Sequence, residues 1–459
     1  MKRAAFALTA LPLLLAGCDL APHYNRPAAP VPPRWPEGGV YPAAVDQAPG
    51  MAWRTLITDD RLRTLVVRAL ADNRDLRATV ASVASARAQY RVQRSALLPT
   101  VAASGNASIN GGRGAADVNN YSATIGFSAF EVDLFGRQRN LSRAAFEQYL
   151  ATDAGARAAR ITLVAETANA WATYAADSDL LAIARDTAAT ARRALDLNQE
   201  LDRAGLVSKL DVRQAETVLA QANSDIESYT TQVAQDRNAI ELLVGGPVAD
   251  DLLPASLSEI DSRYAVAPAG IASSVLLQRP DVLEAEHQLK AANANIGAAR
   301  AAFFPTISLT TALGAASTAL SELFTGGAFG WSVAPSATLP IFGGSRGGNL
   351  AYAKAQRDYY LASYEGAIQS AFRDVADALA RRGTIDRQRA SQRELVVASE
   401  RTLTLANAQY RAGIAGYLDT LTAQRSLYAA RQSEVATILT DLTNRVALYS
   451  ALGADNPAP

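Results

Sequence analysis

Four short stretches of the chain alternate between apolar side chains and small or polar ones. Around residue 125, for example, Tyr121, Ile125 and Phe127 occupy odd positions, and serine, threonine or glycine occupies the even ones. A period of two with one apolar and one small polar face predicts β-strands that contact two different environments. We expect strands at residues 100–110, 121–131, 306–316 and 331–341.

Each pair of predicted strands is followed by a very long helical region. Residues 137–203 and 346–411 contain no proline, and either segment would form a helix of roughly 100 Å. A second helix follows each one, with apolar residues at spacings of three and four that are interrupted only at Asp236, Arg425 and Gln432. A shorter helix is expected over residues 60–97, before Pro99. Helices of this length favour a tubular or coiled-coil-like assembly over a globular core.

A short glycine-containing segment separates the two long helices in each half of the chain. Glycine adopts the left-handed backbone conformation that ends a helix, so we expect helix–turn–helix tips at residues 203–210 and 411–418. The two tips share a motif, in which Arg203-Ala204-Gly205 precedes Leu210-Asp211 and Arg411-Ala412-Gly413 precedes Leu418-Asp419.

The whole architecture occurs twice. Pro99-Thr100 matches Pro305-Thr306, and Phe135-Gly136 matches Phe342-Gly343, at offsets of about 207 residues. We therefore expect a first repeat over residues 51–268, a second over residues 269–453, and a C-terminal tail at 454–459.

The N-terminus has the pattern of an export signal. Lys2 and Arg3 precede an apolar run that is too short to span a bilayer, which predicts a signal peptide over residues 1–17. The segment Leu15-Ala16-Gly17-Cys18 resembles the bacterial lipobox, whose cysteine is lipidated; the alternative is a simple signal peptide cleaved at a small residue. Residues 18–50 are rich in proline and predict an extended arm. Asp19 resembles an inner-membrane retention signal of enteric lipoproteins.

Composition excludes several classes of function. Basic and acidic residues number 44 each, so nothing indicates a nucleic-acid partner, and one cysteine leaves no disulfide or cysteine-based zinc site. His23 lies in the arm and His287 is isolated. The glycine-rich segment 343–348 follows a strand as a phosphate loop would, but its counterpart at Phe135-Gly136 favours a turn. We predict no enzyme, no cofactor and no metal site.

Four strands cannot close a barrel within one chain, and an open sheet edge is not tolerated inside a membrane, so the barrel must be shared between chains. Together with the lipobox, the arm, the duplication and the paired tips, this resembles the outer membrane factor (TolC-like) family, and within it the lipidated efflux branch of OprM and NodT-type lipoproteins. The resemblance implies an α+β membrane protein: a trimeric 12-stranded β-barrel, with four strands per chain, continued by a long periplasmic α-helical barrel. It also implies an equatorial domain, built from the arm, residues 245–271, the C-terminus, and helix breaks near 177–179 and Gly383.

The resemblance also assigns roles to the tips, where the periplasmic end of such a channel closes. It implies a gate that includes an apolar collar, a carboxylate ring and a hydrogen bond from Tyr410 to Asp211; the gate residues are Leu418, Asp419, Asp211, Tyr410, Thr422 and Arg425. Thr422 replaces an acid of relatives, and Ala415 replaces a base. The implied adaptor contacts are Arg203, Ala204, Gly205, Arg411, Ala412 and Gly413. Alternatively, Asp211 and Asp419 are only charges that favour a helix N-terminus, and the tips are only turns.

We therefore expect the outer-membrane channel component of a tripartite efflux system, lipid-anchored in the outer membrane of a Gram-negative bacterium. It would be a passive homotrimeric exit duct for substrates that an inner-membrane RND transporter delivers through a periplasmic adaptor (membrane fusion protein). One alternative is a type I protein-secretion duct, and another is a coiled-coil lipoprotein without a pore. The sequence does not identify the exported substrate, the pump, the adaptor or the resting state.

Overall fold

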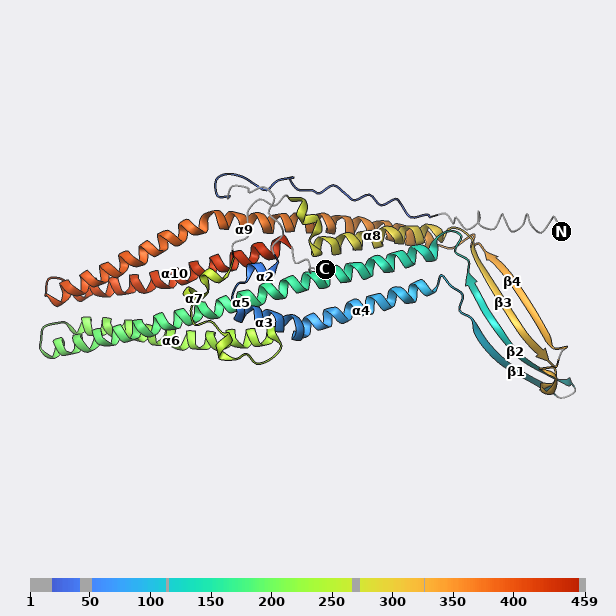
Figure 1. Ribbon diagram of the computed structural model, residues 1–459, viewed down its shortest axis with the longest axis horizontal. Coiled ribbons are helices and arrows are strands. Elements are labelled where there is room, and N and C mark those ends of the chain that lie inside the picture. Colours follow the sequence, from blue (N-terminus) through green and yellow to red (C-terminus); the bar gives the residue numbers. More distant parts are fainter. Residues whose placement is uncertain (1–18, 42–51, 113–114, 266–272, 326, 454–459) are drawn as a thin grey trace. The chain divides into compact units, whose positions relative to one another are not determined.

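The computed structural model describes residues 19–41, 52–112, 115–265, 273–325 and 327–453 (Figure 1). The predicted lipidation site Cys18 and the tail at 454–459 lie outside these residues. The chain divides into two compact units, each built from three segments. The first comprises the arm up to Ala28, Ala81–Ala154 and Leu283–Gly366, and the second comprises the remainder.

The first unit contains one antiparallel sheet with the strand order β1-β2-β3-β4. The strands are β1 (Ala102–Gly112), β2 (Ala115–Glu131), β3 (Thr306–Ser317) and β4 (Phe329–Thr338), and the 3₁₀ turn η5 (Leu320–Glu322) lies between the last two. Ile125, Leu313 and Trp331 are direct neighbours across the sheet. On the other face, hydroxyl groups pair between strands, as in Ser104 with Thr124 at 2.9 Å. One face of the sheet is therefore apolar and the other carries small polar groups.

Two strand ends differ from the prediction by three residues or more. β2 begins at Ala115 rather than Tyr121, because its pairing with β1 continues through residues 115–120, which lack the alternating pattern. β4 ends at Thr338 rather than at residue 341, because Pro340 has no N–H to donate to a neighbouring strand.

The arm in the first unit lies along α8 (Pro280–Ala301). Arg300 donates to the carbonyl of Leu20 at 3.0 Å, and Asn293 donates to that of Pro22 at 2.7 Å. Glu286, whose side chain is buried, accepts from Tyr24 and Arg26. The three α8 residues are seven positions apart and so share one helix face, which holds the arm in an extended conformation.

The second unit contains two pairs of long helices. The first pair consists of α5 (Arg137–Arg203) and α6 (Lys209–Val244), and the second consists of α9 (Ser345–Arg411) and α10 (Tyr417–Leu452). Both α5 and α9 begin in the first unit and continue into the second. The unit also contains shorter elements: α2 (Trp53–Leu56), α3 (Asp60–Asp72), η2 (Asp250–Leu252), α7 (Leu257–Ile260), η3 (Asp261–Arg263) and η4 (Ser273–Gln278). Of these, α2 and α7 contact α10, and α3 contacts α6. The fully buried Trp171 and Tyr264 lie in the core of this unit, where Trp171 donates to the carbonyl of Leu252 at 2.9 Å.

Two expectations about helices were wrong. The helix predicted over residues 60–97 is interrupted at Asn73, whose side chain caps the next helix, α4 (Arg74–Ser95), by accepting from the N–H of Leu76. The helix breaks expected near 177–179 and at Gly383 do not occur, since α5 and α9 are continuous there. Asp179 accepts from the N–H of Leu257 instead of capping its own helix. A single glycine costs only about 1 kcal/mol in a long helix.

Candidate functional site

The two tips have the same local structure. In the first, α5 ends at Arg203, and Gly205 adopts a left-handed conformation with φ of 73°. In the second, α9 ends at Arg411, and Gly413 has φ of 70°. In both, the residue after the glycine donates back to a carbonyl five positions earlier, which satisfies the free end of the helix.

The residues after the two glycines expose apolar side chains in matching positions. Leu206 and Ile414 are 71% and 78% exposed, and Leu210 and Leu418 are also exposed. All six expected adaptor-contact residues are exposed: Arg203, Ala204, Gly205, Arg411, Ala412 and Gly413. The tips thus present an accessible surface of apolar and basic groups within a single chain.

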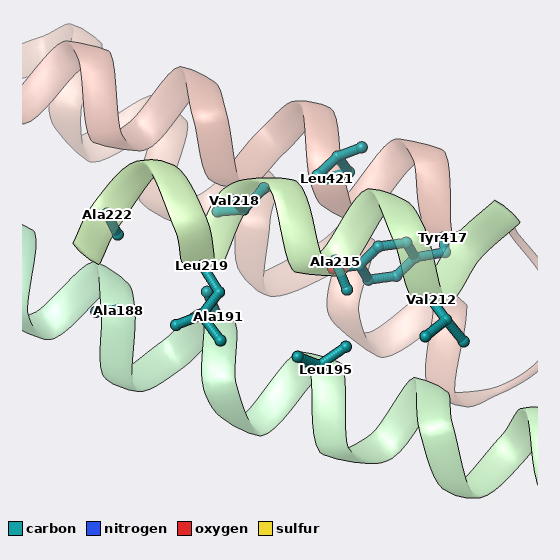
Figure 2. Packing of buried hydrophobic residues seen from close by; sticks show 10 residues of the cluster. All are labelled: Ala188, Ala191, Leu195, Val212, Ala215, Val218, Leu219, Ala222, Tyr417 and Leu421. Carbon is teal, nitrogen blue, oxygen red and sulfur yellow. The ribbon is translucent and has the colours of Figure 1, made fainter. Parts of the chain in front are cut away.

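A small apolar cluster joins the second helix pair to the first just behind the tips (Figure 2). α5 contributes Ala188, Ala191 and Leu195, α6 contributes Val212, Ala215, Val218, Leu219 and Ala222, and α10 contributes Tyr417 and Leu421. Most of the cluster therefore belongs to the first pair, and α10 adds two side chains to it. Apolar packing between the pairs is limited at this end.

Polar side chains make most of the remaining connections between the two pairs. Tyr410 donates to Asn198 at 2.7 Å, and Arg425 donates to Thr217 at 3.1 Å. Further from the tips, the connections are Tyr428 to Asp225 at 2.7 Å, Arg431 to Asp186 at 2.9 Å, and Gln432 to the Tyr229 hydroxyl at 3.1 Å. We call these five contacts the cross-pair bonds.

The hydrogen bond expected from Tyr410 to Asp211 is not formed. Asp211 belongs to a capping box at the start of α6, where its carboxylate accepts from the N–H and hydroxyl of Ser208. Tyr410 instead bonds to Asn198, which is fully buried. Burial, and then the negative charge of Asp211, raise the pKa of Tyr410, so Asp211 acts on this tyrosine through its charge.

The other expected gate residues have different surroundings. Leu418 and Asp419 are exposed in the first turn of α10, and Asp419 is the acidic residue of that turn. The Thr422 hydroxyl donates to the carbonyl of Leu418 on its own helix. Among the expected gate residues, Arg425 and Tyr410 are thus the two that bond across the pairs.

Most of the residues that accept the cross-pair bonds could not be predicted from the sequence. Asn198, Asp225, Asp186 and Thr217 follow no motif in the sequence. The sequence gives one indication of these bonds, because Arg425 and Gln432 interrupt an apolar stripe. A polar side chain in such a position needs a hydrogen-bond partner. Among the described residues, no group of three or more histidine, cysteine, aspartate or glutamate side chains could hold a metal ion. No described helix is long and apolar enough to cross a membrane.

A four-stranded sheet with one apolar face, joined to paired helices of 67 and 36 residues, is the fold of an outer-membrane channel subunit. A model of the outer membrane efflux protein family matches residues 65–246 and again residues 271–454, once in each half of the chain. The chain belongs to the outer membrane efflux protein family.

Two relatives and one solved structure illustrate this membership. The chain is 42% identical to the probable efflux pump outer membrane protein TtgC of Pseudomonas putida, covering 99% of this chain and 96% of TtgC. It is 40% identical to outer membrane protein OprJ of Pseudomonas aeruginosa, with the same coverage of 99% and 96%. It matches the open state of the Neisseria gonorrhoeae MtrE outer membrane channel with a TM-score of 0.85 and 37% identity, covering 95% of this chain and 98% of that one.

These findings confirm the expected family, fold class, function and location. The protein is an efflux channel of the Gram-negative outer membrane, in which each chain adds four strands to a trimeric β-barrel continued by a helical barrel. Its family consists of channels rather than enzymes.

Proposed function

We propose that the two tips form the periplasmic gate of a passive exit duct, and that the cross-pair bonds hold this gate closed. The observation that carries the proposal is the set of polar bonds between two helix pairs that share little apolar packing near the tips. Hydrogen bonds of this kind contribute about 1 kcal/mol each. A partner that binds the tips can therefore replace the cross-pair bonds with contacts of its own.

The homotrimer works with a periplasmic adaptor and an inner-membrane RND transporter, which supplies the energy. The chain itself catalyses no reaction. The adaptor contacts the exposed tip residues Arg203-Ala204-Gly205 and Arg411-Ala412-Gly413. In the trimer, three copies of Leu418 and Asp419 form a collar and a carboxylate ring, which favours cations because like charges in a narrow pore repel one another. Asp211 contributes to the gate through the effect of its charge on Tyr410. Thr422 contributes by its hydrogen bond within the helix turn that carries Leu418.

The remaining assignments concern the chain's ends and its division. Residues 1–17 are a signal peptide, and Cys18 carries the lipid that anchors the arm of residues 18–50. Residues 51–268 and 269–453 are the two structural repeats, and 454–459 are a tail. Incorporation of labelled palmitate, lost in Cys18→Ala, tests the lipidation.

The gate is tested by single-channel conductance of the purified trimer in planar bilayers. We expect a small current in the wild type and a larger one in Tyr410→Phe with Arg425→Ala, because both changes remove cross-pair bonds. Arg213→Ala is the matched control, since Arg213 is exposed and pairs with Glu216 on its own helix. An equal current in all three proteins would refute the gate while leaving the barrel intact.

A further inference from the structure

The folded chain binds the side chain of Asp19, which directly follows the predicted lipidation site in the sequence. The Asp19 carboxylate accepts from the N–H of Ala21 at 3.0 Å. It also accepts from the side-chain amide of Asn140 at 3.0 Å and from the guanidinium of Arg143 at 2.8 Å. Both donors lie in the first two turns of α5, and Asn140 is only 1% exposed. A carboxylate has about four acceptor positions, so these three hydrogen bonds occupy most of them.

The negative charge of Asp19 is paired as well as hydrogen-bonded. Burial acts to raise the pKa of this carboxyl, but the hydrogen bonds from Arg143, Ala21 and Asn140 outweigh it and lower the pKa to about 2. The carboxyl is therefore ionised at any physiological pH, and its charge is matched by that of Arg143. The side chain remains 47% exposed, so the fold removes a free negative charge rather than contact with water.

The position of Asp19 depends on the arm that follows it. Arg300 and Asn293 of α8 donate to backbone carbonyls of the arm directly after Asp19. Gly297 lies between these two donors in the sequence, and a Cβ there would be 2.8 Å from the arm's backbone. The arm, α8 and the start of α5 all belong to the first unit. The arm must lie on α8 for the carboxylate to reach α5.

The sequence and the location of the protein make opposite demands on this carboxylate. An acid directly after a lipidated cysteine resembles an inner-membrane retention signal, yet the protein is a channel of the outer membrane. A signal that consists of an acidic side chain must act through its negative charge, by binding a cationic group. A carboxylate that is already paired with a guanidinium is not free to do so.

We propose that docking of the arm conceals a retention signal: Asn140 and Arg143 bind the Asp19 carboxylate, and the protein can then leave the inner membrane for the outer one. This inference rests on the proposed lipidation of Cys18 and deepens it. It makes the destination of the chain depend on its folding. A chain whose arm is not docked keeps a free carboxylate beside its lipid and stays in the inner membrane.

The test is the distribution of the full-length protein between inner and outer membranes, separated on a sucrose gradient after expression in an enteric bacterium. Arg143→Met removes the charged donor and keeps most of the apolar stem. We expect it to raise the inner-membrane share about tenfold, because the loss of one charge-assisted hydrogen bond favours the undocked arm by at least that factor. Gly297→Ala should act in the same direction while leaving both donors in place. Arg357→Met is the control, since Arg357 pairs with its neighbour Asp358 on α9.

A second substitution separates exposure of the signal from misfolding. Asp19→Ser, added to Arg143→Met or to Gly297→Ala, should return the protein to the outer membrane, because no acid is left to expose. A chain that fails to fold would not be rescued in this way. The inference is overturned if both single variants stay in the outer membrane, or if Asp19→Ser does not restore them.

Palmitate labelling of each variant distinguishes this inference from the proposed lipidation on which it rests. Wild-type protein that takes up no label would refute both. Labelled variants that remain in the outer membrane would refute concealment of the signal and leave the lipid anchor in place.

Discussion

Two carboxyl groups in contact make the stability of the second unit depend on pH. Asp177 of α5 and Asp236 of α6 share a hydrogen bond, and one oxygen of Asp236 is buried without another partner. Burial, and then the hydrogen bond and charge of Asp177, raise the pKa of Asp236 to about 7 from its ordinary 3.8. Tyr229 also faces Asp177, and its pKa is raised by burial and by the charges of Asp225 and Asp177.

The sign of the pH dependence follows from this raised pKa. Between about pH 4 and pH 7 the folded protein holds a proton on Asp236 that the unfolded chain has released, so stability falls as pH rises through this window. The full shift would correspond to about 4 kcal/mol, but the side chain is partly exposed and solvent screens the charges. We expect this pair to lower the free energy of unfolding by about 1–2 kcal/mol between pH 4 and pH 8.

Asp236→Asn tests this prediction, because the amide can still bond to Asp177 but carries no charge. We expect it to raise the free energy of unfolding by about 1–2 kcal/mol at pH 8 and to change it little at pH 4, measured by urea denaturation in detergent. The exposed Asp196→Asn on α5 is the control for a general effect of charge. Equal stabilisation at both pH values, or none at pH 8, would refute the reasoning.

Local periodicity predicted much of this fold because it depends on neighbouring residues. The alternation around Ile125 and Trp331 identified strands whose apolar positions align across the sheet. The Arg-Ala-Gly motifs predicted both tips, where a left-handed glycine ends each helix. The sequence also contains a local signal for the role of Asp211. Ser208 and Asp211 have the spacing of a capping box, which already accounts for the Asp211 carboxylate.

Contacts between distant segments were not predictable in this way. The arm has no periodicity, and the residues that hold it, Glu286, Asn293 and Arg300, look like ordinary polar positions of α8. The partner of Tyr410 depends on the register of two helix pairs, which places Asn198 rather than Asp211 beside its hydroxyl. Such a register is set by packing over many residues, so a single sequence indicates that a polar residue needs a partner but not which one it finds.

Two further substitutions test how the core and the arm are held. Trp171→Phe removes the hydrogen-bond donor to the Leu252 carbonyl at a fully buried position. We expect the free energy of unfolding, measured by urea denaturation, to fall by about 1–3 kcal/mol. A change below about 0.5 kcal/mol would show that another group replaces this bond. Gly297→Ala should release the arm, because a Cβ there would lie 2.8 Å from the Cα of Ala21, too close for any side-chain carbon. We expect faster tryptic cleavage within the arm of the folded trimer. Gly366→Ala, which meets no atom within 4 Å, is the matched control and should leave cleavage unchanged. If both variants are cleaved at the wild-type rate, the α8 face does not hold the arm as the hydrogen bonds indicate.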